Sequence, residues 1–258
     1  MLLTSTKNPI VQSAKALQTA KGRREQDAFL CDGEHMTGEA LRACPEKVSA
    51  LFVEDGQQER FAPLLALARQ TECTIYEVSM AVLETISQVK TPQGIAAVCG
   101  LPKACPLERQ GQKLLLMENV QDPGNVGTIL RTLDAAGFDG CVLTPGCADP
   151  FAPKTMRATM GSLFRVPMTF VENGAEAARW LRTNGWAVIG AELRGQPFYQ
   201  RGTRPDKLCV LIGNEGAGLT EEILAQCSFR YKLPMRGGAE SLNAGIAAAV
   251  MMYDLMNR

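Results

Sequence analysis

The sequence predicts an α/β protein of two domains, the second of which is built on a parallel sheet. Apolar strand-like segments alternate with helical segments along the 258 residues, and this alternation is typical of α/β folds. In the segment 113–117, Lys113 is followed by a continuous apolar run, as expected of a strand covered on both faces. Residues 101–112 break the pattern with prolines and charges, and therefore predict a linker between domains.

The composition is that of an ordinary globular protein. Hydrophobic residues make up 46% and charged residues 21%, and no segment approaches the roughly 20 apolar residues that span a bilayer. The N-terminus lacks an apolar core followed by a cleavage site, so no secretory signal is predicted. Nine cysteines are scattered without a Cys-x-x-Cys pair, which favours free thiols in the cytoplasm over disulfides or a zinc site.

Charge is balanced overall but not along the chain. The formal net charge is zero, whereas residues 1–24 carry five basic side chains and no acid. Such an arm fits phosphate binding or, equally well, a solvated helix face. The chain has one histidine, His35, so no Ser-His-Asp triad is predicted.

The first hundred residues predict a helix followed by alternating strands and helices. Asn8 and Pro9 are typical of the N-cap and first helical position, and they predict a helix to about Leu17. Further helices are predicted at 34–41, 61–69 and 80–86, and strands at 28–31, 48–53, 73–78 and 94–99.

The second domain continues this alternation. Strands are predicted at 113–117, 140–143, 166–170, 186–191, 208–212 and 229–233, and helices at 154–160, 175–182 and about 220–225. After Asn125, a helix places Val126, Ile129, Leu130 and Leu133 on one stripe and leaves Arg131 off it.

The last quarter of the chain is a polar loop before a nearly uncharged helix. Pro234, Gly237 and Gly238 allow the backbone to approach a ligand closely. Ser241 occupies a typical N-cap position, and the apolar helix to Met256 is predicted to be buried on most sides. A surface turn before a packing helix is an equal alternative.

Three polar or glycine-rich loops follow predicted strands, at 119–125, 213–218 and 234–243. Because parallel sheets bind ligands beyond the carboxyl ends of their strands, these loops predict one shared site. The order Gly-x-x-Gly-x-Gly in the second loop is not the dinucleotide pattern, and Glu215 would repel phosphate. No Walker loop is present, and no His, Cys, Asp or Glu cluster has metal spacing, so no metal is predicted.

Together the three loops resemble the motifs of the SPOUT RNA methyltransferases, most closely the TrmH (SpoU) ribose 2′-O-methyltransferases. The matching pieces are Asn125 with Arg131 six residues later, Ile-Gly-Asn-Glu-Gly-Ala-Gly-Leu at 212–219, and Leu-Pro-Met-Arg-Gly-Gly-Ala-Glu-Ser-Leu-Asn at 233–243. The front half is similar to the small substrate-binding domain that precedes the catalytic domain in ribosomal-RNA members. Its best match is Asp-Gly-Glu-His at 32–35.

The resemblance implies a parallel sheet with a C-terminal trefoil knot at 113–258, preceded by a small α/β RNA-binding domain at 1–100 and the linker at 101–112. It also implies S-adenosylmethionine as methyl donor, an RNA substrate and a homodimer. The residues expected around the donor are Ala191, Leu211, Gly213, Leu233, Met235 and Leu242. The residues expected to be catalytic or to face RNA are Arg131, Asn125, Glu215, Ser241 and Asn243.

Within this set, the family places the arginine at the ribose 2′-hydroxyl. A guanidinium has a pKa above about 12 and resists deprotonation, so Arg131 is expected to bind phosphate and hydroxyl and to stabilise developing alkoxide charge. Glu215 and Asn243 are expected to fix the loops and contact the nucleotide. Alternatively, Glu215 is an acid at a helix N-terminus, and Asn125 is also a helix cap.

The expected protein is a cytoplasmic, dimeric RNA ribose methyltransferase, and its two-domain layout favours ribosomal RNA by analogy. Transfer RNA as substrate, an inactive RNA-binding protein and a nucleotide-dependent oxidoreductase stay open. Lys154, Arg157 and Arg165 fit contacts with RNA or ordinary surface charge, and Trp180 and Trp186 are expected in the core.

Overall fold

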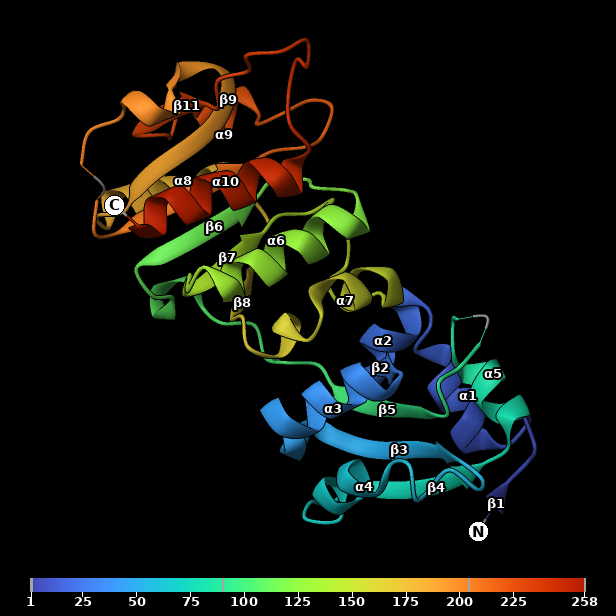
Figure 1. The fold of residues 1–258 in the computed structure, drawn as a ribbon. Coiled ribbons are helices and arrows are strands. Elements are labelled where there is room, and N and C mark those ends of the chain that lie inside the picture. The colour runs from blue at the N-terminus through green and yellow to red at the C-terminus, as the bar shows by residue number, and fades with distance from the viewer. Residues whose placement is uncertain (1, 90, 204, 258) are drawn as a thin grey trace. The chain divides into compact units, whose positions relative to one another are not determined.

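A computed structural model describes residues 2–89, 91–203 and 205–257, and the chain divides into two compact units. Unit 1 comprises Met1–Lys103 and Phe151–Arg165, and unit 2 comprises Ala104–Pro150 and Val166–Arg258. Strands alternate with helices in both units (Figure 1), so the predicted α/β class is confirmed.

Unit 1 is built on a mixed sheet of five strands in the order β1-β4-β3-β5-β2. Strand β4 runs parallel to β1 and β3, whereas β5 runs antiparallel to β2 and β3. The strands are β1 (Leu2–Leu3), β2 (Ala28–Asp32), β3 (Val48–Glu54), β4 (Thr74–Val78) and β5 (Ile95–Gly100). The helices are α1 (Pro9–Ala16), α2 (Ala20–Gln26), α3 (Glu34–Ala43), η1 (Pro45–Lys47), α4 (Ala62–Ala68) and α5 (Met80–Ile86).

Helix α2 and strand β1 are absent from the sequence-based prediction. The sequence of α2, Ala-Lys-Gly-Arg-Arg-Glu-Gln, has no apolar stripe, and the helix begins because the Thr19 hydroxyl accepts the Gly22 N–H at 3.0 Å. Arg23 of the basic arm is buried, and its guanidinium donates to the carbonyl oxygens of Leu17 and Gln18 at 3.0 and 3.2 Å. This arginine therefore holds the turn between α1 and α2.

The segment Phe151–Arg165 belongs to unit 1 although it follows two strands of unit 2. It contains α7 (Pro153–Thr159) and the short helix η3 (Ser162–Phe164). The rings of Phe151 and Phe164 lie 5.1 and 6.1 Å from the ring of Phe29, which is fully buried on β2. This apolar contact explains the grouping, because burying aromatic rings is strongly favourable. Lys154, Arg157 and Arg165 are exposed on this segment.

Unit 2 is built on a six-stranded sheet in which every pair is parallel, in the order β11-β9-β10-β6-β7-β8. The strands are β6 (Lys113–Met117), β7 (Gly140–Leu143), β8 (Met168–Phe170), β9 (Ala187–Pro197), β10 (Leu208–Ile212) and β11 (Phe229–Lys232). The helices are η2 (Leu107–Arg109), α6 (Pro123–Ala135), α8 (Gly174–Thr183), η4 (Phe198–Gln200), α9 (Glu221–Leu224) and α10 (Ala244–Asn257).

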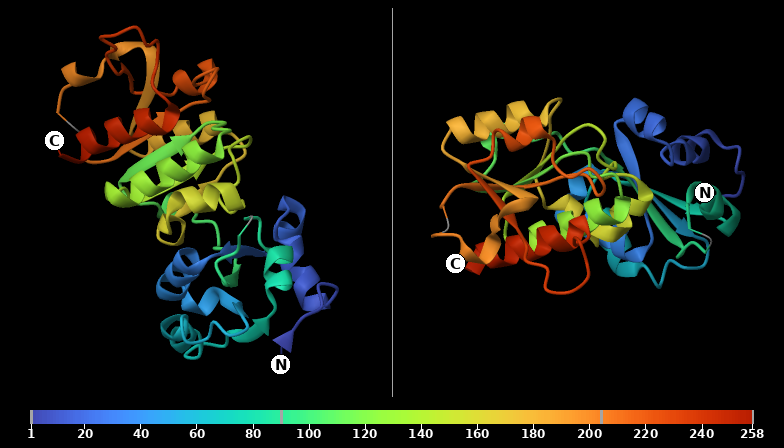
Figure 2. Two further views of the ribbon diagram at one scale, coloured as in Figure 1. Left: turned by 45° about the vertical axis from the view of Figure 1, so that its right-hand side comes forward. Right: turned by 90° about the horizontal axis from the view of Figure 1, so that it is seen from above.

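Helices cover both faces of this sheet, with α6 and α10 on one face and α8 and α9 on the other (Figures 1 and 2). Leu114 through Met117 are fully buried, which confirms the prediction that β6 is covered on both faces. The stripe of α6 is also confirmed, since Val126, Ile129, Leu130 and Leu133 are buried and Arg131 is exposed.

The order of the strands reverses at β6. The successive strands β6, β7 and β8 extend the sheet in one direction, whereas β10, β9 and β11 lie on the other side of β6. This reversal creates a crevice at the carboxyl ends of β6 and β10.

The core of unit 2 also contains both tryptophans. Trp186 is buried, Trp180 packs against the same cluster, and the two rings lie 5.9 Å apart. Their predicted core position is confirmed. Among the described residues, no helix is long and apolar enough to cross a membrane.

Two predictions about the C-terminal helix were wrong. Helix α10 begins at Ala244, and its first turn is capped by Asn243, whose Oδ1 accepts the Ile246 N–H at 3.2 Å, and not by Ser241. The helix is also fully buried on one face only: its flanks are half-buried, and Ile246 and Tyr253 on the outer face are 50% and 44% exposed. The absence of charge therefore produced an apolar outer face as well as a buried inner one.

Candidate active site

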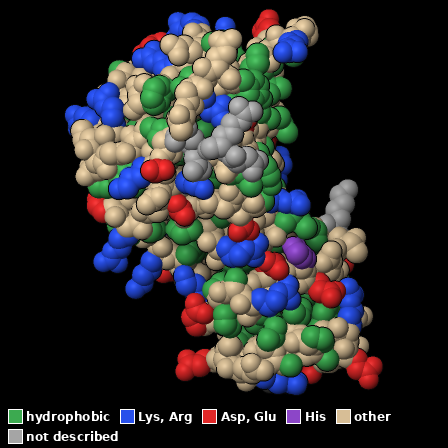
Figure 3. Space-filling view, turned by 60° about the vertical axis from the view of Figure 1, so that its left-hand side comes forward, with side chains coloured by type: hydrophobic (Ala, Val, Ile, Leu, Met, Phe, Trp, Pro, Cys, Tyr) green, Lys and Arg blue, Asp and Glu red, His purple; other side chains and the backbone are tan. Residues whose placement is uncertain are grey.

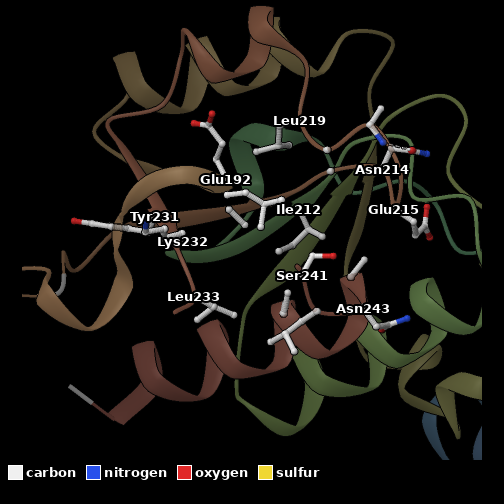
Figure 4. Close-up of a pocket in the computed structure, with 18 of the residues that line it drawn as sticks. Glu192, Ile212, Asn214, Glu215, Leu219, Tyr231, Lys232, Leu233, Ser241 and Asn243 are labelled. Atoms are coloured by element: carbon white, nitrogen blue, oxygen red, sulfur yellow. Dashed lines mark hydrogen bonds between the residues drawn. The ribbon is translucent and has the colours of Figure 1, made fainter. Parts of the chain in front are cut away.

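The second and third predicted loops, at 213–218 and 234–243, border a cavity of about 560 Å³ in unit 2 (Figure 4). The first loop, at 119–125, is joined to both by hydrogen bonds but does not line the cavity. The cavity lies at the carboxyl end of β10, beside the middle of β9 and the beginning of α10. Its wall consists mainly of residues 191–194, 212–219, 231–233 and 240–244. This volume falls in the range of roughly 300–1,000 Å³ that is typical of small-molecule sites.

Most residues predicted to surround a methyl donor line this cavity. The five that do so are Ala191, Gly213, Leu233, Met235 and Leu242. Leu211 does not line it, because its side chain packs in the buried cluster beneath α8 and α9. Side chains alternate along a strand, so the next residue, Ile212, reaches the cavity instead.

The second loop presents main chain to the cavity because it folds back on itself. Asn214 and Gly218 exchange two backbone hydrogen bonds of 3.0 and 2.9 Å. Gly213 lies against this turn so closely that a Cβ atom would be 2.2 Å from the carbonyl carbon of Gly218. Only glycine fits here, and the loop can therefore approach a ligand through its backbone.

Sequence reasoning missed the contribution of Asn214. Its Nδ2 donates to the carbonyl oxygen of Asn119 at 2.9 Å, and its Oδ1 accepts the N–H groups of Gly216 and Ala217, both at 3.0 Å. Asparagine is known to order turns in this way, so its position in a glycine-rich loop was the available signal. Asn214 thus shapes the second loop and ties it to the first.

Glu215, labelled in Figure 4 at the edge of the cavity, joins the second loop to the first. Its carboxylate accepts the backbone N–H groups of Gln121 and Asp122 at 3.2 and 3.0 Å and the Asn125 amide Nδ2 at 2.8 Å. Partial burial raises the pKa of Glu215, but these hydrogen bonds outweigh it and leave the pKa below its usual value. The carboxylate is therefore ionised and weakly basic. It lies at the beginning of α6, not in the first turn of the following helix α9.

Asn125 joins the first loop to the third. Its Oδ1 accepts a hydrogen bond of 2.7 Å from Asn243 Nδ2, while its own Nδ2 donates to Glu215. Asn125 is buried and is not the cap of α6, because Asp122 caps that helix by accepting the Asn125 N–H at 3.0 Å. The chain of Asn243, Asn125 and Glu215 fixes the orientation of both amides.

A glycine in α10 allows this contact. A Cβ atom on Gly245 would lie 3.2 Å from both the Thr128 methyl group and Asn243 Oδ1. Helices α6 and α10 can therefore approach closely at this point, and their first turns bring Asn125 and Asn243 together. The local sequence Ala244-Gly245 is consequently part of the site's architecture.

The structure does not bring all predicted catalytic residues into the cavity. Glu215, Ser241 and Asn243 line it, and Asn125 supports it from behind. Arg131 is exposed on α6, outside the cavity lining. His35 is exposed on unit 1, where it is the purple side chain of Figure 3. Among the described residues, no group of three His, Cys, Asp or Glu side chains is arranged to hold a metal ion.

Comparison with known proteins identifies the two parts of the chain. Residues 112–253 match the SpoU rRNA Methylase family, and residues 8–97 match the MRM3-like substrate binding domain. The chain belongs to the SpoU rRNA methylase family. The resemblance inferred from the three loops is confirmed, including the similarity of the front half to a substrate-binding domain.

Several relatives of this SpoU-family chain match it over almost its whole length. The 23S rRNA (guanosine(2553)-2′-O)-methyltransferase RlmP of Bacillus subtilis is 37% identical over 98% of each chain. The AdoMet-bound rRNA methyltransferase of Sinorhizobium meliloti has a TM-score of 0.87 and 32% identity, and the match covers 99% of this chain and 97% of the other. The AdoMet complex of AviRb from Streptomyces viridochromogenes has a TM-score of 0.85 and 28% identity, with 97% of each chain covered.

Proposed function

We propose that this SpoU-family protein transfers a methyl group from S-adenosylmethionine to a ribose 2′-hydroxyl in ribosomal RNA. The cavity walled by the second and third loops carries the proposal, because the side chains of Asn243 and Glu215 in these loops are both hydrogen-bonded to Asn125 of the first. The named activity of RlmP supports the reaction and the RNA class. The AdoMet-bound relatives support the donor.

The cavity suits S-adenosylmethionine in size and in chemistry. Ile212, Leu219 and Met251 offer apolar surface for the adenosine and thioether portions. The main chain of residues 213–218 lines the cavity and offers carbonyl oxygens that can accept hydrogen bonds from the polar edges. Bound there, the donor supplies an electrophilic methyl group on a sulfonium whose leaving group is a neutral thioether.

The residues of this chain then have to orient the ribose and assist loss of its hydroxyl proton. Holding two reactants in line can lower a barrier by roughly 7–11 kcal/mol. Ser241 and Asn243 line the cavity and are assigned to the nucleotide side. Glu215 is assigned to loop geometry, because its carboxylate is ionised and already accepts three hydrogen bonds.

Arg131 is assigned to the RNA. Its exposed guanidinium can bind a phosphate and the attacking hydroxyl and can stabilise the negative charge that develops on oxygen. It is not assigned as a base, because an arginine side chain stays protonated in proteins. The MRM3-like match at 8–97 supports unit 1 as the RNA-binding domain, and the exposed Lys154, Arg157 and Arg165 are the candidate phosphate contacts there.

The proposal includes a homodimer formed through α10. Its outer face carries Ile246 and Tyr253, 50% and 44% exposed, beside Leu242, 38% exposed. A contiguous apolar face of this kind is typical of an interface. Replacing Ile246 with glutamate is expected to shift the protein from dimer to monomer in analytical ultracentrifugation, whereas Ile10→Glu, an exposed isoleucine on α1, should not. A wild-type monomer at micromolar concentration would contradict the dimer.

The proposed compartment is the cytoplasm. Nine free cysteines, four of them buried, fit a reducing environment. Recovery of the native protein with membranes or from an oxidising compartment after cell fractionation would contradict this assignment. The trefoil knot that the family resemblance implies stays a prediction.

The reaction is tested by transfer of labelled methyl groups from S-adenosylmethionine to unmodified ribosomal and transfer RNA, followed by alkaline hydrolysis. A methylated 2′-oxygen cannot assist strand cleavage, so label is expected in alkali-resistant dinucleotides from ribosomal RNA. Label in mononucleotides would mean base methylation and would contradict the reaction. Label on transfer RNA alone would correct the substrate. Donor binding without any transfer would favour an inactive RNA-binding protein.

A further inference from the structure

A carboxylate outside the cavity holds the exit of the second loop. Glu118 follows β6 directly, and its Oε2 accepts the backbone N–H of Thr220 at 2.9 Å. Its Oε1 accepts the Thr220 hydroxyl at 2.7 Å. The two residues are 102 positions apart in the chain. Glu118 thus clamps one residue through two hydrogen bonds to a charged acceptor, which are stronger than bonds between neutral groups.

Thr220 is the junction between the cavity wall and the helix behind it. Its Oγ1 also accepts the Ile223 N–H at 3.4 Å and so caps α9. The preceding residue, Leu219, lines the cavity and is buried in the core cluster. A displacement of Thr220 would therefore move the part of the wall that Leu219 forms.

The second loop is consequently fastened at both ends to the segment 118–125. At the entry, Glu215 accepts the N–H groups of Gln121 and Asp122. At the exit, Thr220 donates to Glu118. The turn itself is closed by the Asn214–Gly218 backbone pair, and Gly218 has a left-handed φ of +73°. Glycine adopts this conformation without strain and is otherwise flexible, so the hydrogen bonds at the two ends hold the turn in one shape.

We propose that Glu118 and Thr220 form a positioning pair that holds the main chain of residues 213–219 in the geometry that binds the methyl donor. The inference rests on the proposed function, since it names a determinant of donor affinity at the same site. Glu118 does not line the cavity, and it acts on the donor only through Thr220 and Leu219.

The two hydrogen bonds to Thr220 need a carboxylate at position 118, and an amide cannot replace it fully. The two carboxylate oxygens of Glu118 accept the N–H and the O–H of Thr220 separately. A glutamine has one acceptor oxygen, so its NH₂ group, which is a donor, would replace one of these two acceptors. Glu222 provides a matched control, because it is an exposed acid in the first turn of the same helix. Any general effect of negative charge near α9 should be shared by both residues.

The test measures the Kd for S-adenosylmethionine by calorimetry and steady-state methyl transfer to ribosomal RNA, using the full chain. Glu118→Ala is expected to weaken donor binding about tenfold, equal to about 1.4 kcal/mol. The KM for the donor should rise similarly while kcat changes less than about threefold, as expected when only binding is lost. Glu118→Gln should lie between wild type and alanine, and Glu222→Ala should match wild type.

A double-mutant cycle with Thr220→Val separates the pair from a general loss of stability. If the two residues act together, Glu118→Ala combined with Thr220→Val should bind the donor no more weakly than Glu118→Ala alone. If Glu118→Ala folds poorly, donor affinity is measured instead in Glu118→Gln and Thr220→Val, each of which removes part of the same contact. Unchanged donor affinity in these variants would overturn the inference while leaving the proposed function intact. Failure of the wild type to bind the donor would overturn both.

Discussion

Replacing Arg131 with alanine is expected to lower methyl transfer at least about 100-fold and to leave donor affinity within about twofold of wild type. A single side chain that stabilises developing oxyanion charge typically contributes about 10²–10³ to kcat. Arg131 lies outside the cavity lining and off the buried stripe of α6, so its removal should disturb neither the donor site nor the core. Single-turnover transfer to ribosomal RNA, with calorimetry for the donor, measures the two effects separately.

Two control variants test whether charge alone is enough and whether the position of the arginine matters. Arg131→Lys keeps the positive charge but loses the planar fork that matches a phosphate, so it should recover only part of the rate. Arg179→Ala removes an exposed arginine from α8, on the opposite face of the sheet, and should transfer at the wild-type rate. Full activity in Arg131→Ala would show that another group stabilises the attacking oxygen.

The sequence was sufficient for features that depend on neighbouring residues. The stripe of α6 was readable because its four apolar residues lie within two helical turns, and the apolar run at 113–117 predicted a strand that is buried on both faces. The loops after β6 and β10 could be located because each directly follows such a strand. Their order and spacing then carried the resemblance to the SpoU family.

The sequence was insufficient for contacts between distant residues. Asn125 and Asn243 are 118 positions apart, and their hydrogen bond depends on how α6 packs against α10. No periodicity indicates such a pairing, and the local preference for serine at an N-cap pointed to Ser241, whereas packing placed Asn243 there. Phe151 is a similar case, because its contact with Phe29 on β2 groups its segment with unit 1. The contact between Glu118 and Thr220 was missed for the same reason.

The exposed face of α10 shows a different limit. A nearly uncharged helix was expected to be buried on most sides, but Ile246 and Tyr253 are exposed. A sequence pattern reports that a surface avoids water without reporting which surface covers it. Burial by a second copy of the chain would satisfy the same pattern, as proposed above.

Replacing Gly213 with alanine is expected to weaken S-adenosylmethionine binding strongly. The new Cβ atom would lie 2.2 Å from the carbonyl carbon and 2.4 Å from the carbonyl oxygen of Gly218. Both atoms belong to the main chain, so the clash can be relieved only by moving the turn that lines the cavity. Overpacking of this kind costs about 1–3 kcal/mol, which corresponds to a Kd raised by about five- to 150-fold. Calorimetry with the donor measures the change.

Gly237→Ala is the matched control. This glycine lies in the third loop and does not line the cavity, and a Cβ atom added to it would have no neighbour within 4 Å. It should bind the donor like wild type. The Gly213 and Arg131 variants should then fail in opposite ways, the first losing donor binding and the second losing transfer with the donor bound. Normal donor affinity in Gly213→Ala, with an unchanged melting temperature, would mean that the turn of residues 213–218 is not the donor-binding wall.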